Sequence, residues 1–170
     1  HSGIYYKPGS FKANFCVAGR KSMTDYCLEN EIPVWTCGKL IMATDEASES
    51  RLDELEQRGK ANNVEGLRLV GKDEIKEIEP HVNATKALYA PKTGIVDYTK
   101  VSYSYYEKIL SLSGNVFLST KVIGFQRDNE ISVIKTDKGD IKSKYVINCA
   151  GLHSDIIAET MEVKSDVRII

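Results

Sequence analysis

Apolar and small side chains recur at helical spacing along several stretches of the chain, and this periodicity predicts helices there. The predicted helices cover residues 11–30, 45–59, 73–79, 98–112 and 152–161. Residues at the ends of these stretches support the predicted helices. Ser10 can cap the N-terminus of the first helix, and either Thr44 or Asp45 that of the second. Pro80 ends the third helix.

Shorter runs of β-branched, aromatic and other apolar residues lie between these helices and favour strands. The predicted strands cover residues 34–43, 67–70, 86–90, 116–125, 131–136 and 141–148. The last run continues through Ala150 and Gly151 directly into a helix. We therefore expect an α/β or α+β fold, with a mixed sheet and packed helices.

Composition and charge narrow the class of protein. The 170 residues are 42% hydrophobic and 28% charged, with a net charge of -1. These values exclude a disordered chain, and the counts of 12 glycines and 4 prolines exclude a collagen-like one. No apolar run reaches the ~18 residues of a membrane helix. The charge balance argues against a dedicated nucleic-acid binder, which carries a basic surplus, but leaves room for a local basic patch.

The cysteines and histidines do not have the spacing of a metal site. No C-x-x-C pair is present, and the histidines lie far apart in the chain, so we expect no metal. Reduced cysteines are typical of an intracellular protein. No signal peptide is visible, and we expect a cytoplasmic location, with peripheral attachment of the parent protein to a membrane left open. The cysteines are Cys16, Cys27, Cys37 and Cys149.

Complete catalytic motifs are absent from the sequence. It has no G-x-G-x-x-G, no phosphate-binding G-x-x-x-x-G-K-[ST], no G-x-S-x-G and no H-E-x-x-H. The most suggestive local feature is the predicted strand that ends in Ala150-Gly151 and leads into a helix, whose free N–H groups suit an anion or a polar cofactor edge. An ordinary strand–turn–helix joint would look the same.

A series of short motifs carries a resemblance to a known family. The first stretch, HSGIYYKPGS, looks like the HAGIYYxPGS motif of 2-hydroxyglutarate oxidases and dehydrogenases, with Ser2 in place of the usual alanine. These enzymes are flavoproteins of the D-amino-acid-oxidase family. Further matches follow in the family order at residues 12–16, 32–33, 37–40, 79–82, 87–88, 93–98 and 148–155.

The resemblance implies a fold that combines a flavin-binding and a substrate-binding portion. Residues 1–33 would contribute a helix-bearing segment to the flavin site, 34–97 part of the substrate domain, and 98–170 part of the FAD-binding domain, unless the whole chain forms one compact domain. Family members are about twice as long and begin with the G-x-G-x-x-G unit. We therefore expect a middle portion that is inactive and does not retain FAD by itself.

The resemblance also implies catalytic and substrate-binding residues. His1 would lie near the flavin ring and accept the substrate's hydroxyl proton, since an imidazole can act as a base near neutral pH. Tyr5 and Tyr6 are candidates for hydrogen bonds to the substrate. Lys39 offers the cation that a dicarboxylate needs, although an exposed strand lysine is equally ordinary. Tyr98 could face the active site or simply begin a helix after the cap Asp97.

Candidate flavin contacts follow from the same resemblance. Val122 matches a position whose backbone meets the adenine, and it can be a core valine at the same time. Ala150 and Gly151 match the turn that approaches FAD, where glycine allows a close backbone approach. Asn148 would anchor that turn. His81 we interpret as a structural or surface histidine, and His153 as a residue of a helix start.

The reaction implied by the resemblance is oxidation of a 2-hydroxy acid, and the motifs favour L-2-hydroxyglutarate as the substrate and 2-oxoglutarate as the product. The C2 hydrogen would leave as hydride to the flavin. A glycerol-3-phosphate dehydrogenase or an amine-oxidising enzyme on the same fold is the first alternative. A binding module without cofactor is the second. The electron acceptor stays open among oxygen, a quinone and a carrier protein, as does the oligomeric state.

Overall fold

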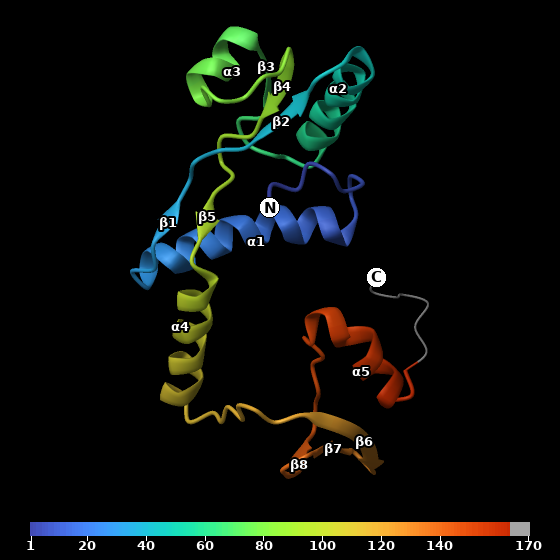
Figure 1. The fold of residues 1–170 in the computed structure, drawn as a ribbon. Coiled ribbons are helices and arrows are strands. Elements are labelled where there is room, and N and C mark those ends of the chain that lie inside the picture. Colours follow the sequence, from blue (N-terminus) through green and yellow to red (C-terminus); the bar gives the residue numbers. More distant parts are fainter. Residues whose placement is uncertain (164–170) are drawn as a thin grey trace. The chain divides into compact units, whose positions relative to one another are not determined.

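The computed structural model describes residues 1–163, and the chain divides into two compact units, His1–Leu112 and a second that begins at Ser113. Figure 1 shows the elements in chain order. The helices are α1 (Phe11–Glu29), α2 (Glu46–Ala61), α3 (Lys72–Ile78), α4 (Tyr98–Ser111), the short 3₁₀ helix η1 (Gly151–His153) and α5 (Ser154–Thr160). The strands are β1 (Val34–Trp35), β2 (Leu40–Ala43), β3 (Arg68–Gly71), β4 (Lys86–Tyr89), β5 (Ile95–Val96), β6 (Val122–Asp128), β7 (Ile131–Thr136) and β8 (Gly139–Ser143).

The strands form three small sheets. In the first unit β4 lies between β2 and β3, and β1 pairs with β5; in the second unit β7 lies between β6 and β8. Every one of these pairs is antiparallel. The mixture of helices and sheets confirms the predicted class, but the described residues form separate antiparallel sheets where a mixed sheet was predicted.

Two predicted strands are interrupted for identifiable reasons. The run 34–43 splits into β1 and β2 because Gly38, with a φ of +79°, turns the backbone out of the extended region. The run 141–148 ends as a strand at Ser143. Tyr145 and Ile147 beyond it are 86% and 85% exposed. A strand needs a neighbour to pair its N–H and C=O groups, and within the described residues these two positions pair with none.

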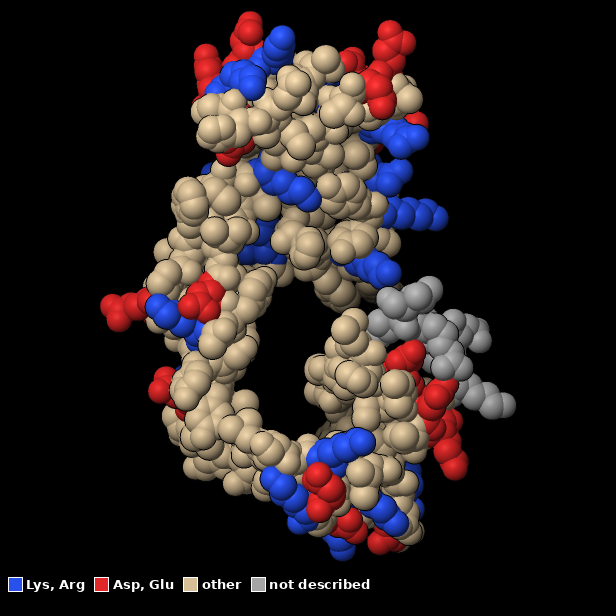
Figure 2. Space-filling view, in the orientation of Figure 1, with Lys and Arg blue, Asp and Glu red and all other residues tan. Residues whose placement is uncertain are grey.

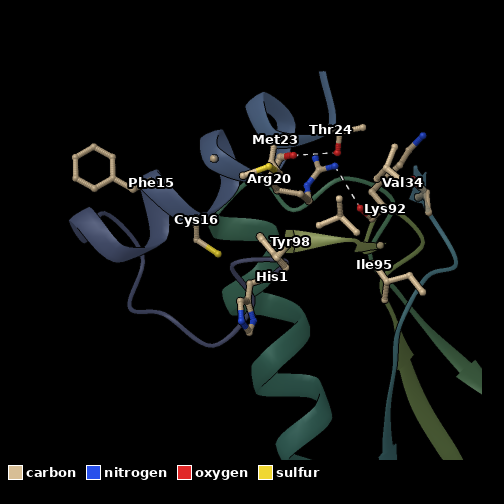
Figure 3. Close-up of a pocket in the computed structure, with 14 residues that line it drawn as sticks. His1, Phe15, Cys16, Arg20, Met23, Thr24, Val34, Lys92, Ile95 and Tyr98 are labelled. Carbon is tan, nitrogen blue, oxygen red and sulfur yellow. Dashed lines mark hydrogen bonds between the residues drawn. The ribbon is translucent and has the colours of Figure 1, made fainter. Parts of the chain in front are cut away.

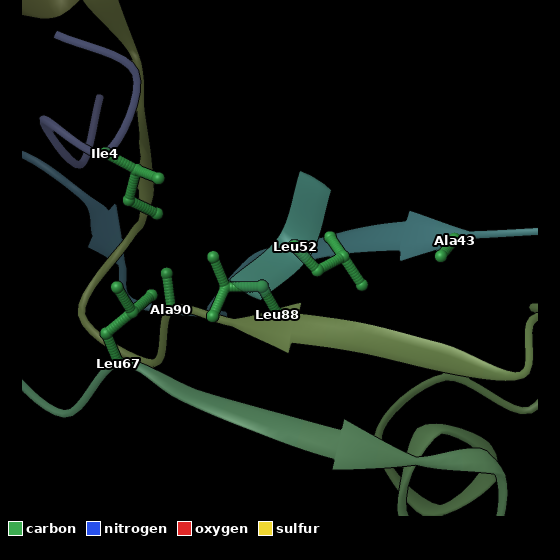
Figure 4. Close-up of a cluster of buried hydrophobic side chains, with 6 residues drawn as sticks. All are labelled: Ile4, Ala43, Leu52, Leu67, Leu88 and Ala90. Atoms are coloured by element: carbon green, nitrogen blue, oxygen red, sulfur yellow. The ribbon is translucent and has the colours of Figure 1, made fainter. Parts of the chain in front are cut away.

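The main hydrophobic core lies between α2 and the β2–β4–β3 sheet (Figure 4). Leu52 of α2 packs there against Leu88 of the central strand, and Ile4 of the N-terminal segment is buried in the same cluster. A second contact ties α1 to α4, because Cys27 and Val101 are buried together with Ile32. The N-terminal motif and both helices are therefore held to one unit.

On the face shown in Figure 2, basic and acidic side chains lie together at the top of the first unit, whereas the middle and right of that unit carry mainly basic side chains. The net charge of -1 nevertheless lacks the basic surplus of a dedicated nucleic-acid binder. Within residues 1–163, no helix has both the length and the hydropathy for crossing a bilayer.

The N-terminus of α2 has a reciprocal cap whose strength depends on pH. The Ser48 hydroxyl and backbone N–H both donate to Asp45 Oδ1, at 2.5 and 2.7 Å, and these hydrogen bonds lower the pKa of the Asp45 carboxyl. A lowered folded-state pKa means that the stabilisation is present above the ordinary aspartate pKa, near 3.9, and is lost as the pH falls through the folded value.

We therefore expect Asp45→Asn, which keeps an N-cap acceptor but does not titrate, to flatten the loss of thermal stability as the pH falls below about 4. Asp45→Ala, which removes the cap, should lower the melting temperature by a few degrees at neutral pH as well. Thermal unfolding followed by circular dichroism checks both variants. Equal pH dependence in wild type and Asp45→Asn would contradict the assignment.

Candidate active site

A cavity of about 210 Å³ lies in the first unit, between α1, the β1–β5 pair and the start of α4 (Figure 3). Residues of α1 form one side of it, and residues of 34–36 and 92–98 form the other. The lining residues are His1, Phe15, Cys16, Gly19, Arg20, Met23, Thr24, Val34, Thr36, Lys92, Gly94, Ile95, Val96 and Tyr98.

The walls of the cavity follow from helix and strand geometry. Cys16, Arg20 and Thr24 are four residues apart on α1 and therefore share one helix face. On the other side, a Cβ at Gly94 would lie 2.8 Å from the carbonyl oxygen of Trp35. Only a residue without a side chain lets β5 approach β1 so closely.

Arg20 is a partly buried cation of this cavity with a hydrogen-bond partner in its wall. Its side chain is 20% exposed, and Nη1 donates a hydrogen bond of 3.3 Å to the carbonyl oxygen of Lys92 (Figure 3). Its Nη2 lies 3.9 Å from a carboxylate oxygen of Glu65. The cavity therefore has a cation held against its wall, and of the described residues that line it none is an aspartate or a glutamate.

His1 and Tyr98 both line this cavity. His1 is exposed, and Tyr98 is the first residue of α4. Asp97 caps that helix as predicted, since its carboxylate accepts hydrogen bonds from the N–H groups of Thr99 and Lys100. The sequence thus singled out two residues, 97 positions apart, that the fold brings to one cavity; their roles stay predictions.

The other predicted substrate residues form a separate cluster. Lys39 Nζ donates a hydrogen bond of 3.1 Å to the Tyr5 hydroxyl, and Arg58 donates to the Tyr5 carbonyl. The half-buried Tyr6 is fixed through its carbonyl, which accepts a hydrogen bond from Asn62. Lys39 lines a different, more open hollow, so the structure does not bring it into the cavity of His1.

The predicted flavin contacts all lie in the second unit. Asn148 anchors the turn as predicted: its Nδ2 donates to the Ser154 carbonyl at 2.7 Å, and its Oδ1 accepts from the Ala150 N–H at 3.1 Å. Gly151 has a φ of +58° and open space where a Cβ would stand. Val122 is half-buried at the start of β6, beside an irregularity in its register with β7. An exposed turn of small residues with its backbone accessible fits a polar cofactor edge.

Sequence reasoning missed Arg20 and Lys92 as cavity residues. A signal for Arg20 is present in the sequence, because it lies four residues after Cys16 and four before Thr24 and so shares their face of the predicted helix. The other two histidines are not in the cavity, and the exposed His81 agrees with its interpretation as a surface histidine. Within the described part of the chain, His, Cys, Asp and Glu side chains do not gather in a group of three that could hold a metal ion.

Comparison with known proteins identifies the protein family of this chain. Residues 1–170 match the family described as FAD dependent oxidoreductase (DAO), so the chain belongs to that family. This confirms the resemblance drawn from the motifs.

Among relatives, the chain is 43% identical to L-2-hydroxyglutarate dehydrogenase of Indibacter alkaliphilus, over 100% of its own length and 43% of that protein. It is 39% identical to the mitochondrial L-2-hydroxyglutarate dehydrogenase of Homo sapiens, covering 100% of this chain and 39% of the human one. The chain thus spans about two-fifths of the length of these relatives.

Solved structures confirm the fold class. L-proline dehydrogenase from P. horikoshii superposes with a TM-score of 0.83 at 20% identity, covering 94% of this chain and 44% of the other. L-alpha-glycerophosphate oxidase from Mycoplasma pneumoniae superposes with a TM-score of 0.82 at 23% identity, with the same coverage. The predicted division into segments 1–33, 34–97 and 98–170 stays a prediction.

Proposed function

We propose that the whole protein to which this chain belongs is an FAD-dependent oxidoreductase that oxidises L-2-hydroxyglutarate to 2-oxoglutarate. The observation that carries the proposal is the 43% identity, over the full chain, to a protein named L-2-hydroxyglutarate dehydrogenase. The cavity agrees with an acidic substrate, because Arg20 and Lys92 line it and no carboxylate does among its described lining residues.

In this proposal His1 takes the proton of the substrate's C2 hydroxyl, and Tyr98 lies beside the substrate in the same cavity. Tyr5 and Lys39, which are joined by a hydrogen bond, would meet the substrate from the neighbouring hollow, with Tyr6 fixing the backbone of the same segment. FAD, when bound, supplies the two-electron acceptor, and Val122, Asn148, Ala150 and Gly151 would hold it. The cytoplasmic location stays a prediction; several relatives are named mitochondrial.

The test is anaerobic bleaching of the bound flavin in the whole protein, with L-2-hydroxyglutarate and sn-glycerol 3-phosphate added separately. We expect L-2-hydroxyglutarate alone to remove the flavin absorbance. Bleaching by sn-glycerol 3-phosphate alone would support an FAD-dependent oxidoreductase but contradict L-2-hydroxyglutarate as its substrate. A whole protein that contains no flavin would overturn the proposal entirely and favour a binding module.

A further inference from the structure

The cavity beside α1 contains a cation that the motif-based prediction did not include. We propose that Arg20 binds the distal carboxylate of the substrate, the one remote from the C2 hydroxyl, and so selects dicarboxylic over monocarboxylic 2-hydroxy acids. This inference rests on the proposed function and adds a residue that determines specificity within it.

The guanidinium of Arg20 retains N–H donors for hydrogen bonds to a ligand. It carries five N–H donors in a planar fork that matches a carboxylate. Its bond to the Lys92 carbonyl, at 3.3 Å, uses one of them. The approach of Nη2 to Glu65, at 3.9 Å, is longer than the 2.7–2.9 Å typical of a charge-assisted hydrogen bond. Because the Glu65 side chain is 67% exposed, solvent screens that pair and it compensates the arginine charge only weakly.

The position of Arg20 favours binding of an anion. The side chain is 20% exposed, and a charge removed from most of its water interacts more strongly with a ligand than a fully solvated one. The Lys92 carbonyl holds the guanidinium against the cavity wall (Figure 3), which reduces the side-chain entropy lost on binding. The exposed His1 lines the same cavity, so the proposed proton acceptor and the proposed carboxylate-binding group share one hollow.

The size of the cavity and its charge restrict the ligand further. At about 210 Å³ it is smaller than the roughly 300–1,000 Å³ of drug-sized pockets, which suits a small organic acid. Two other hollows of the first unit each include an acidic residue, Glu79 in one and Asp97 in the other. Of these three hollows, the Arg20 cavity combines basic side chains with a lining free of acidic ones.

The test compares two ligands of equal chain length in the FAD-loaded whole protein, by calorimetric titration. Glutarate carries the distal carboxylate, whereas pentanoate lacks it. For Arg20→Gln we expect glutarate to bind about 10- to 100-fold more weakly, since a hydrogen bond between charged groups is lost, and pentanoate to change less than about 3-fold. The KM for L-2-hydroxyglutarate should rise in parallel with the glutarate dissociation constant.

Two further variants separate this role from a structural one. Glu65→Gln removes the neighbouring charge but keeps the guanidinium, and we expect it to leave both affinities unchanged. Arg20→Lys keeps the charge without the planar fork, and we expect it to bind glutarate with intermediate affinity. If Arg20→Gln does not fold, this lysine variant tests whether Arg20 binds the distal carboxylate.

Three results would overturn the inference. The arginine variants could bind glutarate and pentanoate with equally reduced affinity, they could bind glutarate as tightly as the wild type does, or the wild type could bind glutarate no more tightly than pentanoate. Its failure differs from failure of the proposed function, in which L-2-hydroxyglutarate does not bleach the flavin of the wild type at all.

Discussion

Replacing His1 by glutamine in the whole protein is expected to lower kcat/KM for L-2-hydroxyglutarate by about 10²- to 10⁴-fold, the usual contribution of a positioned general base. The reason is the placement of an exposed imidazole in a cavity that has basic and no acidic lining residues within its described part. Glutamine can still donate and accept hydrogen bonds but cannot take up the hydroxyl proton. The loss should therefore fall on kcat, with KM changed little.

Steady-state kinetics of the FAD-loaded protein measures this effect, and His81→Gln is the matched control. His81 is exposed outside the cavity, so the same substitution there should leave both constants unchanged. A loss smaller than about 10-fold in His1→Gln would show that another group accepts the proton. A loss confined to KM would make His1 a binding residue.

Leu88→Ala is expected to lower the free energy of unfolding of the first unit by about 2–5 kcal/mol, the range for removing a buried leucine side chain. Leu88 is 0% exposed on the central strand β4 and packs in the cluster that contains Leu52 of α2. The substitution removes apolar contacts with both layers and leaves a cavity that the sheet and the helix fill only in part.

Urea unfolding checks this prediction, with Leu28→Ala on α1 as the control. Leu28 is 66% exposed in this chain, so its truncation should change the free energy of unfolding by no more than about 0.5 kcal/mol. Equal effects of the two substitutions would mean that the core between α2 and the sheet does not determine the stability of this unit.

The sequence predicted the helices of the first unit well because their signals are local. The Ser10 side-chain oxygen accepts a hydrogen bond from the Ala13 N–H, and α1 begins at Phe11, directly after this cap, as predicted. Asp45 likewise caps α2. Turn residues place β7 within the predicted limits of 131–136. Each of these features depends on residues within about one helix turn of each other.

The apolar runs were less informative, since a run of β-branched residues does not say which neighbour it will pair with. The predicted strand 116–125 begins only at Val122. Ser119 just before it has a φ of +52°, outside the extended region. Strand pairing joins positions far apart in the chain, and periodicity carries no information about such partners.

In the candidate site, too, some residues could be predicted from sequence motifs and others depend on long-range contacts. Motifs in the sequence determined the family and singled out His1 and Tyr98, which do share a cavity. They also singled out Lys39, which the fold places in another hollow beside Tyr5. In the sequence Arg20 is one polar position of a predicted helix, and only the folded chain brings it to the Lys92 carbonyl that accepts its hydrogen bond.

Local patterns and motifs were therefore sufficient to predict the family, the helices of the first unit and the N-caps of α1, α2 and α4. The tertiary structure alone decided that the sheets are antiparallel and separate, and which charged groups share a cavity. The physical reason is the range of the interactions. Caps and turns join residues close together in sequence, whereas the contact of Arg20 with Lys92 spans 72 positions and exists only once α1 has packed beside the β1–β5 pair.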